Sequence, residues 1–248
     1  MKLPIRLKSE PIVDAIFEIR FAAKTQIASI LPGYLYSTLG GTSVERLSAA
    51  DIPEAIRVSD ANLRALPTQK VFIDKFYILV GDELLGIGCQ LPYPGWAEFR
   101  PVIEKVLNTV HALKLVLSVH RYSMKYVDVL PAKDSGEALS MLDLGIELGG
   151  QKLKHEKFQL RTELVRGAFI HVVNLVGSAQ MLIANQPQRN SGAIVDIDSI
   201  CDLSPAMRFE SFLMKLKASA DEIHEANKEL FFELLQQETV NSLGPDYE

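Results

Sequence analysis

The fold is decided by residues 204–236, SPAMRFESFLMKLKASADEIHEANKELFFELLQ. Ser204 offers a hydroxyl cap and Pro205 is favoured at a first helical position, so the sequence predicts a helix over Ala206–Gln236. Side chains at three- and four-residue spacing trace one face of it: Phe209, Phe212, Leu213, Leu216, Ala220, Ile223, Asn227, Leu230, Phe231 and Leu234. At 1.5 Å per residue this helix is about 45 Å long, enough to cross a sheet.

A second amphipathic helix is predicted over Trp96–Leu113, after the chain-breaking stretch Pro92-Tyr93-Pro94-Gly95. Its apolar stripe must also lie on other structure. Each of the two helices closes a run of strand-like segments, so the same order of elements occurs twice. Residues 1–248 are therefore predicted to form one domain, or two pseudo-repeated halves, 1–115 and 116–248.

The segments before each helix alternate between apolar and polar residues, as half-buried strands do. The predicted strands are 15–21, 71–80, 84–90, 119–130, 158–165, 168–176, 180–185 and 193–200. Turns at 81–83 and 166–167 join two hairpins. Strands grouped before helices indicate an α+β fold. We expect a large curved antiparallel sheet, or two sheets side by side, with the two long helices packed on one face.

Composition narrows the class of protein. The 248 residues carry 26 basic and 31 acidic side chains, a net charge of −5, and 48% are hydrophobic. The two cysteines, Cys89 and Cys201, are typical of reduced thiols packed as small hydrophobes. We find no signal peptide and no run of the ~18 apolar residues that a membrane span needs. The sequence therefore predicts a cytoplasmic protein with no membrane contact.

Nucleic-acid binding is disfavoured by the acidic balance, because the phosphate backbone calls for a basic surface. The basic residues that could still form a local patch are Arg57, Arg64, Lys70 and Lys75.

The predicted strand 119–130 carries the first candidate site. One face presents His120, Tyr122, Met124, Tyr126 and Asp128. If this face lines a cavity under the helices, it offers the aromatic walls and polar tips of a ligand pocket. If it is core, its polar tips find hydrogen-bond partners inside the protein.

Tyr93 and Trp96 are the second candidates, as an aromatic platform for a ligand or partner. Their position where a strand meets a helix equally suits a plug of the core. Both interpretations stay open from the sequence alone.

Asp196 and Asp198 lie on one face of the last predicted strand. With a third oxygen ligand they could hold a divalent cation; alternatively they keep a sheet edge soluble. The stretch from His224 to Lys228 starts like a zinc-protease helix, but a lysine stands where the second histidine is needed. No phosphate loop or nucleophile elbow is found, so catalysis finds little support.

Several blocks resemble a family of prokaryotic proteins of about this length, described as sporadically distributed and without an assigned function. The similar blocks are Pro11–Phe21, Leu31–Gly33, Pro92–Phe99, Arg121–Asp128, Ile194–Asp198 and His224–Phe231. The resemblance spans nearly the whole chain, although Lys125 and Asp128 stand where the family pattern has Arg and Asn. It implies no catalytic residues. Its patchy occurrence implies genes on mobile elements, which often serve defence or toxin neutralisation.

These observations lead to a non-enzymatic protein that binds another protein, in a mobile-element, defence or toxin–antitoxin setting. A homodimer through the C-terminal helix is the partner expected first. The alternative is a domain that binds a small molecule or nucleotide, with metal-dependent hydrolysis in which Asp196 and Asp198 act as metal ligands or general bases.

Overall fold

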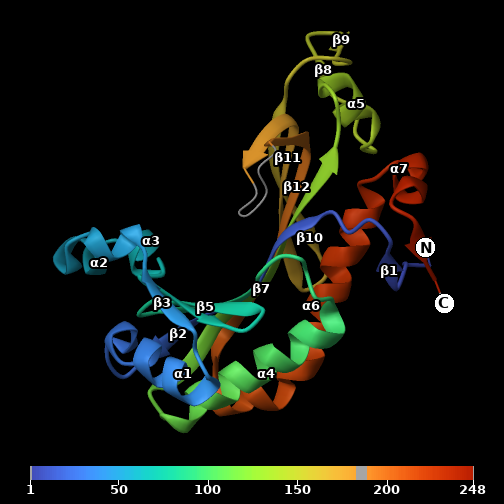
Figure 1. Ribbon diagram of the computed structural model, residues 1–248. Coiled ribbons are helices and arrows are strands. Elements are labelled where there is room, and N and C mark those ends of the chain that lie inside the picture. Colours follow the sequence, from blue (N-terminus) through green and yellow to red (C-terminus); the bar gives the residue numbers. More distant parts are fainter. Residues whose placement is uncertain (1, 183–188, 248) are drawn as a thin grey trace. The chain divides into compact units, whose positions relative to one another are not determined.

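The computed structural model describes residues 2–182 and 189–247, and its fold is α+β as predicted. Nine strands form an antiparallel sheet in the order β10-β11-β12-β7-β2-β6-β5-β4-β3, and two small sheets pair β1 with β13 and β8 with β9 (Figure 1). The strands are β1 Arg6–Leu7, β2 Ile12–Ala23, β3 Ser43–Arg46, β4 Gln69–Ile73, β5 Phe76–Val80, β6 Leu84–Cys89, β7 Val116–Pro131, β8 Glu147–Leu148, β9 Gln151–Lys152, β10 Gln159–Arg166, β11 Phe169–Leu182, β12 Arg189–Arg208 and β13 Pro245–Asp246. The helices are η1 Ile27–Ser29, α1 Leu31–Leu39, η2 Ser48–Asp51, α2 Glu54–Ser59, α3 Ala61–Arg64, α4 Trp96–Ala112, α5 Ser135–Ser140, α6 Phe209–Glu233 and α7 Gln237–Ser242.

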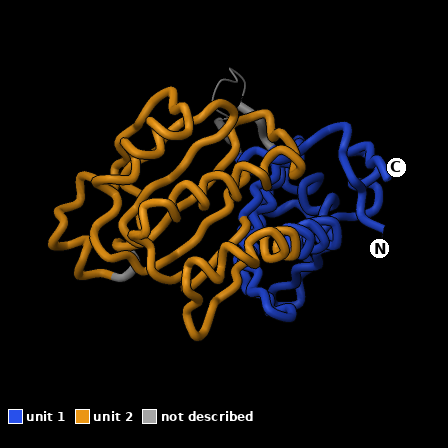
Figure 2. The backbone as a smooth tube through the Cα atoms, turned by 90° about the horizontal axis from the view of Figure 1, so that it is seen from below, with its two compact units in different colours: residues 1–14, 125–199, 224–248 blue, residues 15–124, 200–223 orange. Residues whose placement is uncertain are grey.

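The chain divides into two compact units (Figure 2). Unit 1 comprises residues 1–14, 125–199 and 224–248, and unit 2 comprises residues 15–124 and 200–223. Strands β2, β7 and β12 and helix α6 each contribute residues to both units. The predicted halves at residues 115 and 116 stay a prediction. Among the described residues, no helix has both the length and the apolar composition needed to cross a membrane.

In unit 2 one face of the sheet is apolar and is covered by helices. The register of β2, β5 and β6 puts Phe17 and Phe76 on this face. Phe76 stacks on Phe99 of α4 with ring centroids 6.0 Å apart. Tyr122 of β7 lies between Phe17 and Phe212 of α6, at 6.4 and 5.6 Å. Both long helices therefore bury their apolar stripes on the same face, as the periodicity predicts.

Helix α4 runs antiparallel to the first part of α6. Trp96 at the start of α4 bonds Asp221, while His111 near its end contacts the ring of Phe209. The buried stripe of α4 consists of Phe99, Ile103, Val106, Leu107 and Val110. Their three- and four-residue spacing keeps these side chains on one side of the helix, as an amphipathic helix requires.

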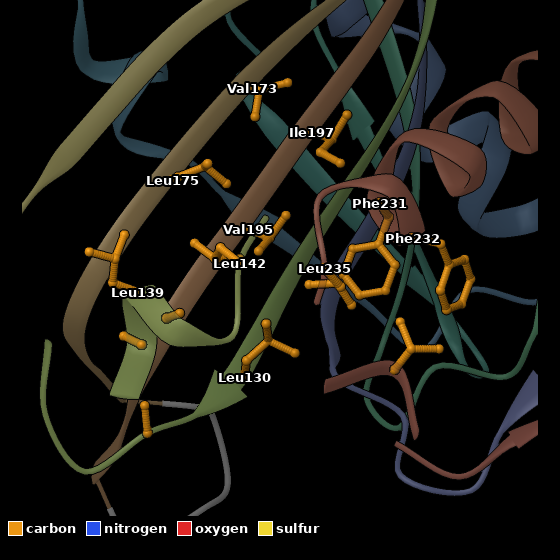
Figure 3. Packing of buried hydrophobic residues seen from close by; sticks show 14 of the residues in the cluster. Leu130, Leu139, Leu142, Val173, Leu175, Val195, Ile197, Phe231, Phe232 and Leu235 are labelled. Atoms are coloured by element: carbon orange, nitrogen blue, oxygen red, sulfur yellow. The ribbon is translucent and has the colours of Figure 1, made fainter. Parts of the chain in front are cut away.

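Unit 1 has its own hydrophobic core (Figure 3). Val195 and Ile197 of β12, both fully buried, face the last turns of α6, where Phe231 and Phe232 lie. Strands β7 and β11 and helices α5 and α7 complete the cluster, which includes Leu130, Leu139, Leu142, Val173, Leu175 and Val240. The inner positions of β12 are thus those that the alternation of the sequence predicts to be apolar.

Some predicted boundaries were wrong. Helix α6 begins at Phe209, and Ser204 and Pro205 belong to β12, because pairing within the sheet overrides a local helix-start signal. The single predicted strand 71–80 is two strands, β4 and β5, joined by a turn in which Asp74 has a φ of 47°. Aspartate tolerates that left-handed conformation better than most residues. Residues 183–185 of the predicted strand 180–185, and the start of the loop after it, lie outside the described residues.

Candidate functional site

The predicted ligand-binding face of β7 is built largely into the cores of the two units. Tyr122 is 5% exposed, and its ring is held between two phenylalanine rings of unit 2. Burial is the main cause of the raised pKa of Tyr122, and a hydrogen bond with the thiol of Cys201 is the second cause. His120, by contrast, is exposed. For Tyr122 the core interpretation is therefore the one the geometry supports.

Tyr126 is buried in unit 1, where its hydroxyl lies 2.9 Å from Nδ1 of His224 on α6. The two rings meet edge to face, with centroids 5.8 Å apart. This contact fastens β7 to the second half of α6. It uses the polar tip of Tyr126 inside the protein, as a buried tyrosine generally requires.

Asp128 is 3% exposed, which is unusual for a carboxylic acid. Burial raises its pKa well above the usual range, and the negative charges of Glu10 and Asp196 raise it further. The raised pKa extends the pH range over which the side chain is protonated and neutral. Such a perturbed carboxyl is a candidate for acid–base chemistry when a substrate can reach it, but Asp128 is covered.

Tyr93 and Trp96 are half-buried beside the start of α4. The ring edges of both meet Phe99, at centroid distances of 6.4 and 6.0 Å. The indole nitrogen of Trp96 donates to a carboxylate oxygen of Asp221 at 2.9 Å, and Arg100 lies 3.1 Å from the other oxygen. These contacts anchor α4 to α6, which favours the structural interpretation of both aromatic residues.

Asp196 and Asp198 share one face of β12, as predicted. A carboxylate oxygen of Asp196 lies 3.0 Å from Nζ of Lys125 on β7. The ammonium group supplies the positive charge that a cation would otherwise bring. Among residues 2–182 and 189–247, no three His, Cys, Asp or Glu side chains are grouped so that they could hold a metal ion. The divalent-cation site stays a prediction.

A buried polar network under α6 was missed by the sequence analysis. His171 Nδ1 lies 2.7 Å from the hydroxyl of Ser199, and the amide nitrogen of Asn227 donates to that hydroxyl and to the carbonyl of Ile197, both at 2.9 Å. The sequence does indicate such a network, because Asn227 and Ser199 are polar residues at positions where the helix and strand periodicities predict apolar ones.

A serine paired with a histidine can form a nucleophile and base. Here Ser199 is fully buried, and His171 and Asn227 are each 1% exposed. The pKa of His171 is lowered mainly by burial and secondly by the positive charge of Arg166, so the neutral ring is favoured. Because the Ser199 hydroxyl is enclosed by the residues that the structure describes, this network is best explained as structural support for β11, β12 and α6.

The structure does contain a surface pocket, in unit 2, with a volume of about 280 Å³. We call it the arginine pocket; its lining residues are Ala23, Thr25, Gln26, Arg57, Val58, Arg64, Asp82 and Glu83. Arg57 lies 3.4 Å from Asp82, and Arg64 lies 3.6 Å from Glu83. Asp82 also accepts a hydrogen bond from the backbone of Ala28, which fixes the turn between β5 and β6.

The four basic residues considered for nucleic-acid binding each have a local partner. Arg57 and Arg64 line the arginine pocket beside carboxylates. Lys70 lies over the ring of Tyr77, 3.8 Å from its centroid, and Lys75 pairs with Glu98 at 2.9 Å. The carboxylates beside Arg57, Arg64 and Lys75 lower the net positive charge that these three residues can offer to phosphate groups.

No known protein-family model matches the chain, and no curated protein is similar to it.

Proposed function

We propose that this chain is a non-enzymatic protein that binds another protein, with the arginine pocket as part of its contact surface. The observation that carries the proposal is the combination, at one place in unit 2, of a pocket of about 280 Å³, its arginines and the exposed apolar side chain of Val58. Interfaces combine apolar contacts with arginine in this way.

One exposed apolar side chain lines the pocket, and two more lie close to lining residues in the sequence. Val58, which lines it, is 48% exposed, and Ile56 on the same helix is 53% exposed. Ile30, which follows η1, is 45% exposed. The side-chain amide of Gln26 donates to Glu54 at 2.6 Å, which ties the segment before η1 to the start of α2. A partner that covers the pocket would bury Val58.

A binding role rather than catalysis is also supported by where the acid–base side chains lie. Asp128, His171 and Ser199 are each covered by packed residues. The charged residues that remain accessible at the arginine pocket are arginines paired with carboxylates, which can recognise a partner but are poor general bases.

Site-specific photo-crosslinking in the native host tests the proposal. A photoreactive amino acid at position 58 should yield adducts with a protein partner. Leu117 is a matched control, because it too is 48% exposed and lies in unit 2. Arg64→Ala should reduce the adduct at position 58 without changing the melting temperature. Equal adducts at both positions, or none at either, would contradict the proposal.

The second candidate is binding of a small anionic molecule in the same pocket. It is favoured by Arg64, whose buried Nε has no hydrogen-bond acceptor among the described residues. The volume lies just below the ~300 Å³ at which ligand pockets begin, so only a small molecule would fit. A thermal-shift screen with nucleotides and small carboxylates decides it: a ligand must raise the melting temperature of the wild-type protein but not of Arg64→Ala.

The proposed setting on a mobile element, in defence or toxin neutralisation, is tested by the gene neighbourhood. A toxin, nuclease or restriction gene beside this one would support it.

A further inference from the structure

Strand β10, Gln159–Arg166, forms one end of the nine-stranded sheet. It pairs with β11 on one side, and no other strand among the described residues pairs with its second side. An eight-residue edge of this kind presents a row of backbone donors and acceptors to any other extended chain.

The backbone groups that point to the open side can be identified from one hydrogen bond. The amide of Gly177 on β11 donates to the carbonyl of Phe158 at 3.1 Å, so these two residues form a hydrogen-bonded pair. In an antiparallel ladder such pairs alternate with pairs whose backbone groups point away. Residues 160, 162, 164 and 166 therefore use their backbone groups on β11, and residues 159, 161, 163 and 165 direct theirs to the open side.

The side chains of β10 alternate in the same period. Leu160 and Leu164 are partly buried and pack against the core of unit 1. Arg161 and Glu163 are exposed on the other face, where they form an ion pair at 2.9 Å. Val165, on that same face, is 75% exposed.

We propose that the open side of β10 binds β10 of a second copy of this chain, antiparallel, with the twofold axis at Thr162. In this register Arg161 lies opposite Glu163 of the second copy, and Glu163 lies opposite its Arg161. Leu160 and Leu164 also lie opposite each other. The outward-pointing residues form four hydrogen-bonded pairs, or about eight backbone hydrogen bonds, because each pair exchanges two.

The charges select this register and this partner. A shift of the axis to Arg161 places the two Arg161 side chains directly opposite, and a shift to Glu163 does the same for the two carboxylates; like charges in these positions destabilise a sheet. A shift that moves the pairing by one residue matches outward-pointing backbone groups with inward-pointing ones. The strand is thus complementary to itself in one arrangement, as an isologous twofold interface requires.

This interface differs from the dimer that the sequence predicts through the C-terminal helix. The apolar stripe of α6 is already buried within the chain at Phe212, Leu216, Ile223 and Leu230. The second side of β10, in contrast, pairs with no strand among the described residues. The inference does not depend on the proposed function, because β10 belongs to unit 1 and the arginine pocket to unit 2.

Charge reversal tests the interface. The full-length protein should sediment as a dimer. Arg161→Glu and Glu163→Arg each put like charges opposite, so the dissociation constant of either variant should rise about tenfold or more. The variant that carries both changes restores opposite charges and should dimerise again. Mixing the two single variants should give a heterodimer, because every position is then matched. A monomer at all concentrations, or single variants that dimerise like the wild type, would overturn the proposal.

A cysteine at the axis gives an independent geometric readout. Thr162→Cys places two thiols in a non-hydrogen-bonded pair, where Cα atoms lie about 4.5 Å apart, within disulfide range. Val165→Cys is the control on the same strand, because its two copies would be about 20 Å apart. The native cysteines, Cys89 and Cys201, are buried. Mild oxidation should cross-link position 162 and not position 165; equal cross-linking at both would overturn the register.

Discussion

Asn227 should be a stability determinant of unit 1, and replacing it with aspartate tests the role assigned to the network under α6. Asn227→Asp keeps the shape of the side chain but removes the nitrogen that donates to Ile197 and Ser199. A negatively charged oxygen then faces a carbonyl oxygen at a site that is 1% exposed. The perturbation is therefore electrostatic and leaves packing almost unchanged.

The magnitude follows from two contributions. Each of the two lost hydrogen bonds is worth about 1 kcal/mol net, and an uncompensated buried charge costs about 3–5 kcal/mol, so the free energy of unfolding at pH 7 should fall by about 5–7 kcal/mol. Asn227→Leu loses the same two bonds without adding a charge. The free energy of unfolding of this variant should therefore be about 2 kcal/mol below that of the wild type, and the comparison separates the two contributions.

Urea denaturation followed by circular dichroism measures both values. Asn108→Asp is a matched control on α4, because the Asn108 amide also donates to a backbone carbonyl, that of Glu104, but at an exposed position. Water can replace that bond, so its effect should stay within about 0.5 kcal/mol. If Asn227→Asp costs no more than Asn108→Asp, the network is not the support that its geometry indicates.

Three further predictions follow from single contacts. Phe212→Ala, at a ring that is 1% exposed, should lower the free energy of unfolding by about 3–5 kcal/mol, while Met214→Ala, at 78% exposure on the same helix, should change it by less than about 0.5 kcal/mol in thermal and urea unfolding. The folded-state pKa of Asp128 is raised above 3.8, so its stability contribution is complete below pH 3.8 and is lost as the pH rises through the folded-state pKa. Asp128→Asn should therefore stabilise the protein at neutral pH. Urea denaturation over a pH series checks this, because the loss of stability that the wild type shows with rising pH should disappear in the variant. Gly88→Ala should lower the free energy of unfolding by about 1–3 kcal/mol, because a Cβ atom would lie 2.2 Å from the ring of Tyr77. The same substitution should cost less in a Tyr77→Ala background. A Gly88→Ala variant as stable as the wild type would contradict the close approach.

The fold could be predicted well where apolar residues keep one spacing over a long stretch of sequence. The stripes of α4 and α6 and the hairpin of β10 and β11 lie where the spacing of side chains indicates. Boundaries were predicted less well, as at Ser204, because a helix start depends on local residues whereas a strand can be extended by a neighbour that is distant in the sequence.

The candidate site was predicted only in part. Alternation placed Tyr122 and Tyr126 on a strand, but it could not say whether a cavity or a helix lies over them. Contacts with Phe212 and His224, about 90 to 98 positions away, decide that they are covered. The arginine pocket could not be predicted from the sequence, because its lining residues come from four separate stretches of unit 2.

The sequence by itself determined the fold class, the two amphipathic helices and the alternating strands, because these depend on the period with which neighbouring side chains point to one face. Only the tertiary structure decided which polar residues are buried partners, such as Ser199 and Asn227, and which strands lie at the edges of the sheet. Those outcomes depend on distances between residues that folding brings together, and no local pattern specifies them.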